Sequence, residues 1–368
     1  MEAQYWSTRP DVVVGGEPGS ATALVRLSNV KADARGARIV VRQAQRVTVW
    51  DIARPQEPVL EFGERVDTPP VGGPRGVYPD SAGLWIRYDN GWGRFAHDGR
   101  FVSSKPNPPD RWLGSVAILS DGSFLARERR PPASRVFAWE EEHPGWEIAV
   151  AHVRLADESW IADTLAMYDA SGQTFALAVD GSRTFSGQPF ADHDIFYRNP
   201  RCGAAGFVER RGLGDEVRVV EIMPGNDTIL DARVPVRPVS LERERVEAEI
   251  EAKVRDVQGL LRYSGGDTLS TAEVRAIVEE TLYVPRVLPL VTAVVPTVSN
   301  EVWLRSNERT DSATVWYVLD RSDVGATHRK VELPGWFRLR DATRDHVWGL
   351  RVDARRSGQV QGRRLVRP

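Results

Sequence analysis

Short apolar runs alternate with polar turns along the whole chain. In residues 300–320, an apolar strand is followed by a polar turn and by a second apolar strand that ends at an acidic residue. Residues 36–51 and 83–99 repeat this order. Short apolar runs between turns rich in Gly, Asn, Asp and Ser are typical of antiparallel β-strands. The pattern therefore predicts a protein built almost entirely from β-strands.

Polar turns mark a repeat. One strand before each marker and two or three strands after it make about four short strands per repeat. Four-stranded repeats of ~40–50 residues are the pattern of a β-propeller. We therefore predict an all-β, six-bladed β-propeller, with seven blades as the alternative, in a single domain over residues 1–368. The markers are residues 34–36, 81–83, 120–122, 201–203, 298–300 and 343–345.

The two ends of the chain are expected to complete this fold. The last repeat, residues 346–368, provides two strands and lacks an outer one. An apolar segment within residues 4–16 can supply the missing strand. Such pairing removes exposed sheet edges, which promote aggregation. We predict that an N-terminal strand pairs with the last repeat and closes the ring.

This order of units resembles a known group of proteins. The series begins with residues 36–63 and ends with residues 336–353, and it resembles the six-bladed β-propeller proteins of secreted bacterial origin related to the NHL-repeat group. The resemblance covers most of the chain but lies in the repeat pattern and not in a catalytic motif. The Gly-rich turn that family members often carry between the first two blades is replaced by residues 62–76. The resemblance implies a propeller and export, but no single activity, because propellers include hydrolases, lyases and binding proteins.

Residues 240–282 depart from the strand pattern. Residues 240–264 have apolar side chains at helical spacing after a predicted N-cap at Ser240, and a second helix begins at a capping box formed by Ser270 and Glu273. We predict a helical hairpin on one face of the propeller, either as a lid and wall at the central mouth or as a cap on the rim. The apolar stripes are Val246, Ile250, Val254, Val257 and Leu261, then Val274, Ile277, Val278 and Leu282.

Composition narrows the classes of partner. The net charge of −2 gives no sign of a surface for nucleic acid. Cys202 is the single cysteine, which excludes an intrachain disulfide and a cysteine-based metal site. No apolar run is long enough to span a membrane, and the first residues do not read as a signal peptide. We expect a monomer that is periplasmic or secreted, with its leader removed; a cytoplasmic protein is the alternative.

The candidate chemistry lies in two segments. G-x-S-x-G, H-E-x-x-H and Gly-rich phosphate loops are absent from the sequence. Residues 139–146 combine Trp139 and Trp146, suited to stacking on sugars or aromatic groups, with three Glu and with His143, suited to acid–base chemistry. Residues 192–194 combine Asp192, His193 and Asp194 at the expected entry to an inner strand. We expect both segments to face one cavity, with His143 and His193 as catalytic candidates.

Arginines form a third group of candidates. Arg75, Arg111 and Arg286, with Arg26, stand where the chain enters the predicted inner strands. Guanidinium groups converging there would suit a carboxylate or sulfate ligand. Nearly all basic residues of this chain are Arg, so arginines are also expected at these positions by chance. A cationic ring and a chance arrangement are the two interpretations.

Two functions remain open at this stage. The leading hypothesis is an exported propeller that binds a small molecule, oligosaccharide or peptide at its central mouth. The alternative is a metal-assisted hydrolase or lyase, like the lactonase-type propellers, that acts in the central channel. For that alternative we predict Asp192 and Asp194 as metal ligands, and an oxygen-rich set favours Ca²⁺. A scaffold that binds proteins on its outer surfaces is the third option.

Overall fold

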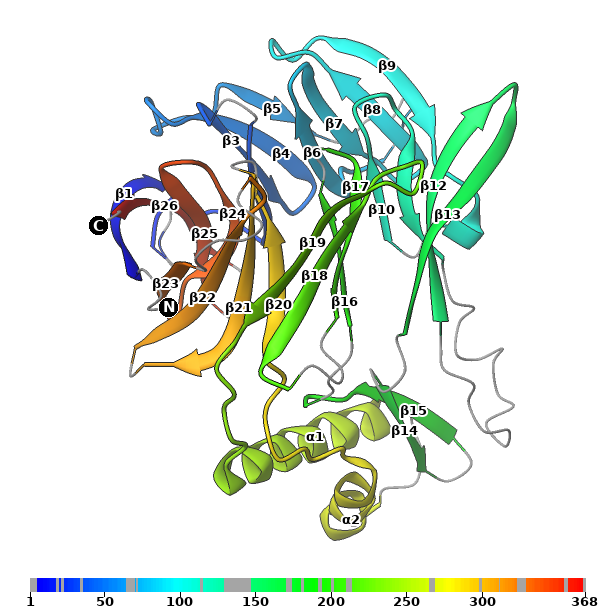
Figure 1. Cartoon of the computed structure of the whole chain (residues 1–368), viewed down its shortest axis with the longest axis vertical. Helices are drawn as coiled ribbons and strands as arrows, with labels where there is room; N and C mark the ends of the chain where they lie inside the picture. Colours follow the sequence, from blue (N-terminus) through cyan, green and yellow to red (C-terminus); the bar gives the residue numbers. More distant parts are fainter. Residues whose placement is uncertain are drawn as a thin grey trace.

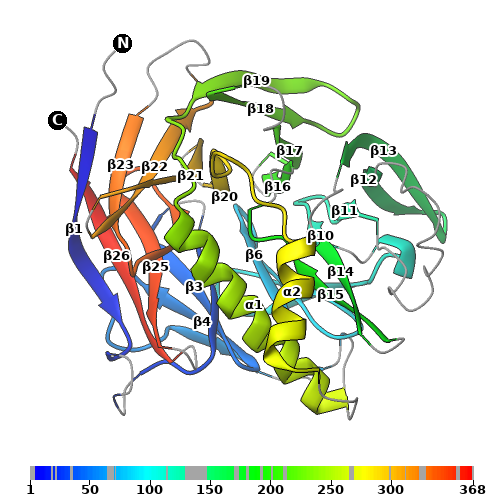
Figure 2. The ribbon, with the colours of Figure 1, turned by 90° about the horizontal axis from the view of Figure 1, so that it is seen from below.

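The structure is a computed structural model. It describes residues 5–17, 20, 23–33, 36–63, 70, 72–112, 115–128, 147–169, 174–179, 182–190, 194–199, 202–209, 214–264, 269–297, 300–310, 312–322, 329–353 and 357–366. Antiparallel sheets in these residues are arranged around a common centre, with β1, β13 and β19 at the periphery (Figure 2). This arrangement places the protein in the β-propeller class.

Four sheets have four strands each, and each sheet follows the order of the chain. The first contains β2 (Leu27–Ala32), β3 (Arg38–Gln43), β4 (Arg46–Asp51) and β5 (Leu60–Phe62). The second contains β6 (Gly76–Asp80), β7 (Gly83–Arg87), β8 (Gly91–Phe95) and β9 (Phe101–Pro106). The third contains β10 (Ser115–Ile118), β11 (Phe124–Arg127), β12 (Glu147–Ala156) and β13 (Ser159–Asp169). The fourth contains β16 (Ile195–Asn199), β17 (Ala204–Glu209), β18 (Glu216–Ile222) and β19 (Thr228–Pro235).

The last part of the chain forms one larger sheet. Its eight strands lie in the order β20-β21-β22-β23-β1-β26-β25-β24. The strands are β20 (Val291–Pro296), β21 (Glu301–Arg309), β22 (Ala313–Asp320), β23 (Arg329–Pro334), β24 (Arg338–Ala342), β25 (His346–Val352), β26 (Gly358–Val366) and β1 (Tyr5–Val14).

The prediction of six separate blades is wrong, as is the alternative of seven. The structure has four four-stranded sheets and one eight-stranded sheet, because β1 joins two groups of strands that the repeat pattern treats as independent. β1 pairs antiparallel with β26, as the closure prediction expects, and also pairs in parallel with β23 through Tyr5–Lys330 and Trp6–Val331. This second pairing merges the two groups. A local repeat pattern does not encode it.

Apolar clusters between neighbouring sheets hold the ring together. Val30 and Ile39 of the first sheet pack with Trp348 and Leu350 of the eight-stranded sheet. Between the two halves of the eight-stranded sheet, Trp6 packs with Trp303 and Val331. Further clusters join the first sheet to the second, the second to the third, the third to the fourth, and the fourth to β20–β22. Each indole or branched side chain buried in this way contributes about 1.5–3 kcal/mol.

Two helices and a hairpin lie together beyond one end of the sheets, α1 (Arg243–Ser264), α2 (Thr271–Thr281) and the two-stranded sheet of β14 (Thr174–Val179) and β15 (Ser182–Gly187) (Figure 1). The capping box of α2 is confirmed, since the Ser270 side chain accepts from Glu273 N and the Glu273 carboxylate accepts from Ser270 N. Ser240 is not the cap of α1, because Ser240 pairs with Val287 as an isolated β-bridge and the helix starts after it.

The two helices pack through their predicted apolar stripes. Ile250, Val254 and Val257 of α1 are buried against Val274 and Val278 of α2. A short 3-10 helix, η1 (Asp110–Trp112), precedes β10. Among the described residues, neither long helix has the length and apolarity needed to cross a membrane.

Candidate functional site: a cationic central cavity

The first strands of the sheets lie towards the centre of the molecule. β2 lies against β6 and β24, and β20 lies against β16 and β24. A cavity of about 310 Å³ opens where β2, β16, β20 and β24 meet. Its described lining is Asn29, Lys31, Phe196, Tyr197, Arg198, Val294, Val295, Pro296, Leu339 and Arg340. The exposed surface of this lining is more polar than apolar, and the cavity is large enough for a small ligand.

The cationic groups of the cavity come from three different strands. Lys31 lies on β2, Arg198 on β16 and Arg340 on β24, and all three side chains are half-buried. The described lining contains no carboxylate side chain. Among the described residues, no acidic side chain forms an ion pair with Lys31 or Arg198. The cavity is therefore an electropositive hollow suited to a negatively charged ligand.

Strand alternation explains how these residues reach the centre. On β2, Val30 and Ala32 are fully buried, while Asn29 and Lys31 are half-buried and line the cavity. Successive side chains of a strand point to opposite faces, so Asn29 and Lys31 share one face of β2. Lys31 Nζ lies 3.4 Å from the carbonyl oxygen of Arg340, to which it donates, and this links β2 to β24.

Arg198 is held by an aromatic residue of another sheet. Its guanidinium carbon lies 5.5 Å from the centre of the Tyr78 ring, and its Nη1 donates to the Tyr78 hydroxyl over 3.4 Å. The Tyr78 hydroxyl in turn donates to the carbonyl oxygen of Val116 over 2.9 Å. Tyr78 lies on β6 and Val116 on β10, so Arg198 is held by a tyrosine of the second sheet that is itself fixed to the third sheet. A guanidinium already held over a ring loses little further freedom on binding an anion.

The wall beside Arg198 is anchored by a buried ion pair. The Tyr197 hydroxyl donates to Glu221 Oε1 over 2.9 Å. Arg321 donates to both oxygens of Glu221, from Nε over 2.7 Å and from Nη2 over 2.8 Å. The side chain of Glu221 has no exposed surface and that of Arg321 is 7% exposed. Burial and the neighbouring Glu221 carboxylate raise the pKa of Tyr197 well above its usual value, so its hydroxyl stays neutral.

A second buried carboxylate joins the strands on the opposite side. Asp341 is 1% exposed, its Oδ2 accepts from Ala32 N over 3.0 Å, and its Oδ1 accepts from Ala342 N over 2.9 Å. Asp341 thereby fixes β24 beside β2 and sets the positions from which Lys31 and Arg340 reach the cavity.

The predicted mouth arginines lie elsewhere. Arg75 is paired with Asp89 and Arg111 with Glu128, the latter over 2.7 Å, and both arginines are exposed. Arg286 is exposed in the segment after α2, and its carbonyl oxygen accepts from Leu241 N. These three arginines are not among the described residues that line the cavity.

Most of the other predicted site residues lie outside the described residues. They are Trp139, His143, Trp146, Asp192 and His193. Asp194 is described and lies half-buried just before β16. No group of three or more His, Cys, Asp or Glu residues suited to a metal occurs in the part of the chain that the structure describes. The metal-assisted alternative thus depends on Asp192 and His193, whose surroundings are not described.

Lys31, Arg198 and Arg340 are absent from the residues predicted from the sequence, although the sequence carries a signal for one of them. The sequence has 49 Lys and Arg residues, of which only four are Lys, and Lys31 is one of these four. Lys31 lies in an apolar strand, on the same face as Asn29. Arg198 and Arg340 carry no comparable signal, because arginine occurs throughout the sequence.

Comparison with known proteins finds similar solved structures alone. No family model and no curated protein matches this chain, so the resemblance to the NHL-repeat group stays a prediction. Similar solved structures include a catalytically inactive virginiamycin B lyase from Staphylococcus aureus with quinupristin (11% identity over 95% of this chain and 98% of that chain, TM-score 0.42). Another is an oligogalacturonate lyase in complex with manganese (10% identity, 97% of each chain, TM-score 0.42). The WD40 domain of SCAP from fission yeast is a third (9% identity, 94% of this chain and 82% of that chain, TM-score 0.35). At these identities and TM-scores, the likeness says nothing about the activity of this chain.

Proposed function

We propose that the protein is a β-propeller that binds a small organic anion in its central cavity. One observation supports this most directly, namely that Lys31, Arg198 and Arg340 meet at a cavity of about 310 Å³ whose described lining has no carboxylate. Lys31 and Arg198, which form no ion pair within the described residues, are stabilised by a ligand that brings negative charge. The size of the cavity fits a molecule with one to three carboxylate, sulfate or phosphate groups and a small apolar body.

The apolar part of the lining defines the rest of the ligand. Phe196, Val294, Val295 and Leu339 supply apolar surface, while Asn29 offers an amide beside the cations. Asn29 Oδ1 already accepts from Val30 N over 2.9 Å, which leaves the amide N–H₂ as the group that faces a ligand acceptor. Such a site favours an anion over a neutral molecule of the same size.

The proposal is tested by calorimetry with citrate and with inorganic phosphate, at low ionic strength, with glycerol as the neutral probe. Citrate is expected to bind and glycerol not to bind. Lys31→Gln and Arg198→Gln should each weaken citrate binding at least tenfold, which corresponds to about 1.4 kcal/mol. Arg233→Gln is the matched control, because Arg233 lies on the peripheral strand β19 and pairs with Glu216 there.

Binding that is equal in the wild-type protein and in both cavity variants would contradict the proposal, as would failure of both anions to bind. The same experiment examines the predicted mouth residues. Arg75→Gln, Arg111→Gln and Arg286→Gln should leave citrate binding unchanged if the ligand is held by the cavity cations alone. A loss in any of them would extend the site to the mouth, together with Trp139 and Trp146.

The hydrolase or lyase alternative remains a separate proposal. It places His143 and His193 as acid–base groups and Asp192 and Asp194 as ligands of Ca²⁺. Metal analysis of protein purified without chelator tests it, together with the change in melting temperature on adding Ca²⁺. Ca²⁺ at a molar ratio near one, lost in Asp194→Asn, would favour this alternative.

A further inference from the structure

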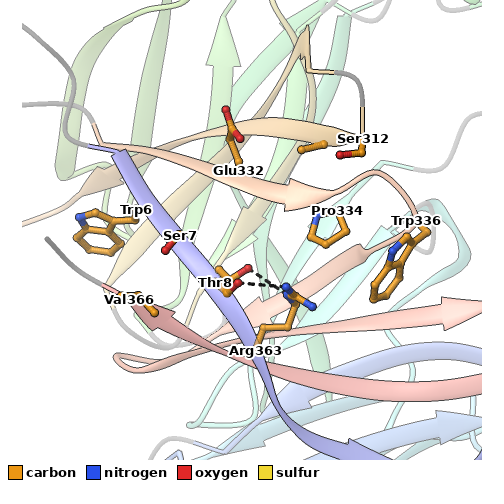
Figure 3. Close-up of a pocket in the computed structure, with 10 residues that line it drawn as sticks. Trp6, Ser7, Thr8, Ser312, Glu332, Pro334, Trp336, Arg363 and Val366 are labelled. Carbon is orange, nitrogen blue, oxygen red and sulfur yellow. Dashed lines mark hydrogen bonds between the residues drawn. The ribbon is translucent and has the colours of Figure 1, made fainter.

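A second and larger hollow lies at the outer edge of the ring, where β1 separates from β23. Its volume is about 690 Å³, and it shares no described lining residue with the central cavity. Figure 3 shows its walls, which come from β1, from the start of β22, from β23 with the turn that follows it, and from β26. We call it the rim crevice. It is lined by Trp6, Ser7, Thr8, Ser312, Ala313, Glu332, Pro334, Trp336, Arg363 and Val366.

Two strand edges diverge to form the rim crevice. β1 pairs with β23 only through Tyr5–Lys330 and Trp6–Val331. From Ser7 onward, the described pairing of β1 is with β26 alone. β23 continues from Glu332 to Pro334 and pairs there only with β22. An open strand edge presents backbone N–H and C=O groups in a row, and an extended peptide binds to such an edge by adding a strand.

A buried arginine lies in the wall of this crevice. Arg363 is 8% exposed, its Nε donates to Thr8 Oγ1 over 3.0 Å, and its Nη2 donates to the carbonyl oxygen of Thr8 over 3.1 Å (Figure 3). Both acceptors are neutral. Within the described residues, Arg363 has no carboxylate partner, and Glu332, which also lines the crevice, forms no ion pair with it. Burial lowers the pKa of Arg363, as expected for a cation without a counter-ion.

The remaining walls restrict what fits beside Arg363. Trp336 is 44% exposed and Val366 is 43% exposed, so the crevice offers apolar surface at its rim. The Arg351 guanidinium lies 5.2 Å from the centre of the Trp336 ring and covers one side of it. Glu332 contributes one negative charge to the same hollow, which disfavours polyanions such as nucleic acids. A ligand with a single carboxylate, placed at Arg363, meets less repulsion from Glu332 than a polyanion does.

We propose that the rim crevice binds an extended peptide segment that carries one acidic side chain. The backbone of the peptide adds to the edge of β23 or of β1 beyond Trp6. Its carboxylate accepts hydrogen bonds from the Arg363 guanidinium. An apolar side chain two residues from the acidic one, and therefore on the same face of the added strand, packs on Trp336.

The probe for this proposal is a fluorescein-labelled heptapeptide, Thr-Val-Thr-Asp-Val-Thr-Val, with blocked ends, compared with the same peptide carrying Asn in place of Asp. Fluorescence anisotropy is expected to show binding of the Asp peptide and at least tenfold weaker binding of the Asn peptide. Arg363→Gln should remove this preference and weaken the Asp peptide at least tenfold. Arg364→Gln is the matched control, because Arg364 is the next residue of β26 and is exposed on its other face.

Hydrogen exchange locates the bound peptide. Binding should protect the amides of residues 7–14 or 332–334, because an added strand takes up their free backbone groups. Trp336→Ala is a second variant on the exposed rim, and it should weaken both peptides without lowering the melting temperature. It keeps the proposal testable if Arg363→Gln fails to fold.

Four results would overturn the proposal. The first is equal affinity for the Asp and Asn peptides. The second is an equal loss of affinity in Arg364→Gln and Arg363→Gln. The third is an absence of binding by the wild-type protein at millimolar peptide. The fourth is complete competition by acetate at the concentration of the peptide, which would assign the crevice to small carboxylates.

Discussion

Two arginines have largely buried side chains between strands of this ring. One has a carboxylate partner, and the other has only neutral hydrogen-bond acceptors. Arg321, directly after β22, donates to both oxygens of the fully buried Glu221 and to the carbonyl oxygen of Glu301. Arg363, on β26, donates only to the hydroxyl and carbonyl oxygens of Thr8. Burial alone would lower the pKa of Arg321, but Glu221 raises it, whereas the pKa of Arg363 is lowered by burial.

The difference separates a structural ion pair from a site that can still take a ligand. The Glu221 carboxylate accepts from Arg321 and from Tyr197, so its hydrogen-bonding capacity is taken up within the protein. This pair joins the fourth sheet to the eight-stranded sheet, since Glu221 lies on β18 and Arg321 follows β22. A guanidinium with only neutral acceptors, beside a hollow of about 690 Å³, retains affinity for a carboxylate. One arginine is therefore committed to a carboxylate of the protein, and the other is available to a ligand.

The largest effect is expected for Glu221→Gln. The change leaves Arg321 buried without a counter-charge, and breaking a buried pair in this way costs about 3–5 kcal/mol. Urea denaturation measures the free energy of unfolding. The double variant Glu221→Gln with Arg321→Met should recover most of that loss, since no charge remains buried. Glu209→Gln is the control, because Glu209 forms an exposed pair with Arg218, and its loss should be below about 1 kcal/mol. A cost for Glu221→Gln as small as that of the control would contradict the comparison.

A smaller effect is expected for Arg363→Met. No carboxylate is left unpaired, Thr8 keeps access to water in the crevice, and the apolar stem of the side chain is retained. The loss of two hydrogen bonds to neutral groups, offset by relief of a buried charge, predicts a change within about 1 kcal/mol in either direction. The same denaturation experiment applies. A loss as large as that of Glu221→Gln would mean that Arg363 has a structural partner equivalent to Glu221.

Local patterns in the sequence predict the elements well. The strand–turn–strand order predicted for residues 36–51 matches β3 and β4, and that predicted for residues 300–320 matches β21 and β22. The capping box of α2 was found because Ser270 and Glu273 are three residues apart and the motif needs no other part of the chain. The pairing of the two ends was found because the last repeat lacks a strand and the N-terminal segment is apolar.

Long-range pairing explains what the sequence did not reveal. Glu221 and Arg321 are 100 positions apart, and neither position differs in local pattern from other acidic or basic strand residues. The parallel pairing of Tyr5 and Trp6 with β23 depends on how two groups of strands meet in space, so the count of separate sheets was missed. The cavity cations were not predicted for the same reason, because Lys31, Arg198 and Arg340 lie on three strands that are far apart in the sequence. The hairpin of β14 and β15 forms a separate two-stranded sheet, and the repeat pattern does not predict it.

A carboxylate placed beside Arg363 should make its surroundings resemble those of Arg321. In Thr8→Asp, a carboxylate replaces the hydroxyl that lies 3.0 Å from Arg363 Nε. A charge-assisted hydrogen bond is stronger than a neutral one by about 1 kcal/mol, so the free energy of unfolding should rise by about that amount. Binding of the Asp heptapeptide should be lost at the same time. Thr8→Asn is the matched control, since it supplies the same shape without charge, and it should leave the peptide preference in place.

The smallest effect is expected for an exposed pair, Arg75 with Asp89, whose side chains are 56% and 44% exposed. Asp89→Asn should cost roughly 0.2–1 kcal/mol at neutral pH, because water and salt screen such pairs.

The hydrogen bond from Arg75, together with that from Gly73 N, lowers the pKa of Asp89 below its ordinary value of 3.8. A carboxyl group whose pKa is lower in the folded state stabilises the protein above pH 3.8 and loses this effect as the pH falls through the folded value. The difference in unfolding free energy between wild type and Asp89→Asn should therefore be constant from pH 7 to pH 5 and should shrink below about pH 4. Thermal melting at these pH values measures it. A difference that grows on acidification would reverse the sign of the shift and would show that the pair does not form in solution.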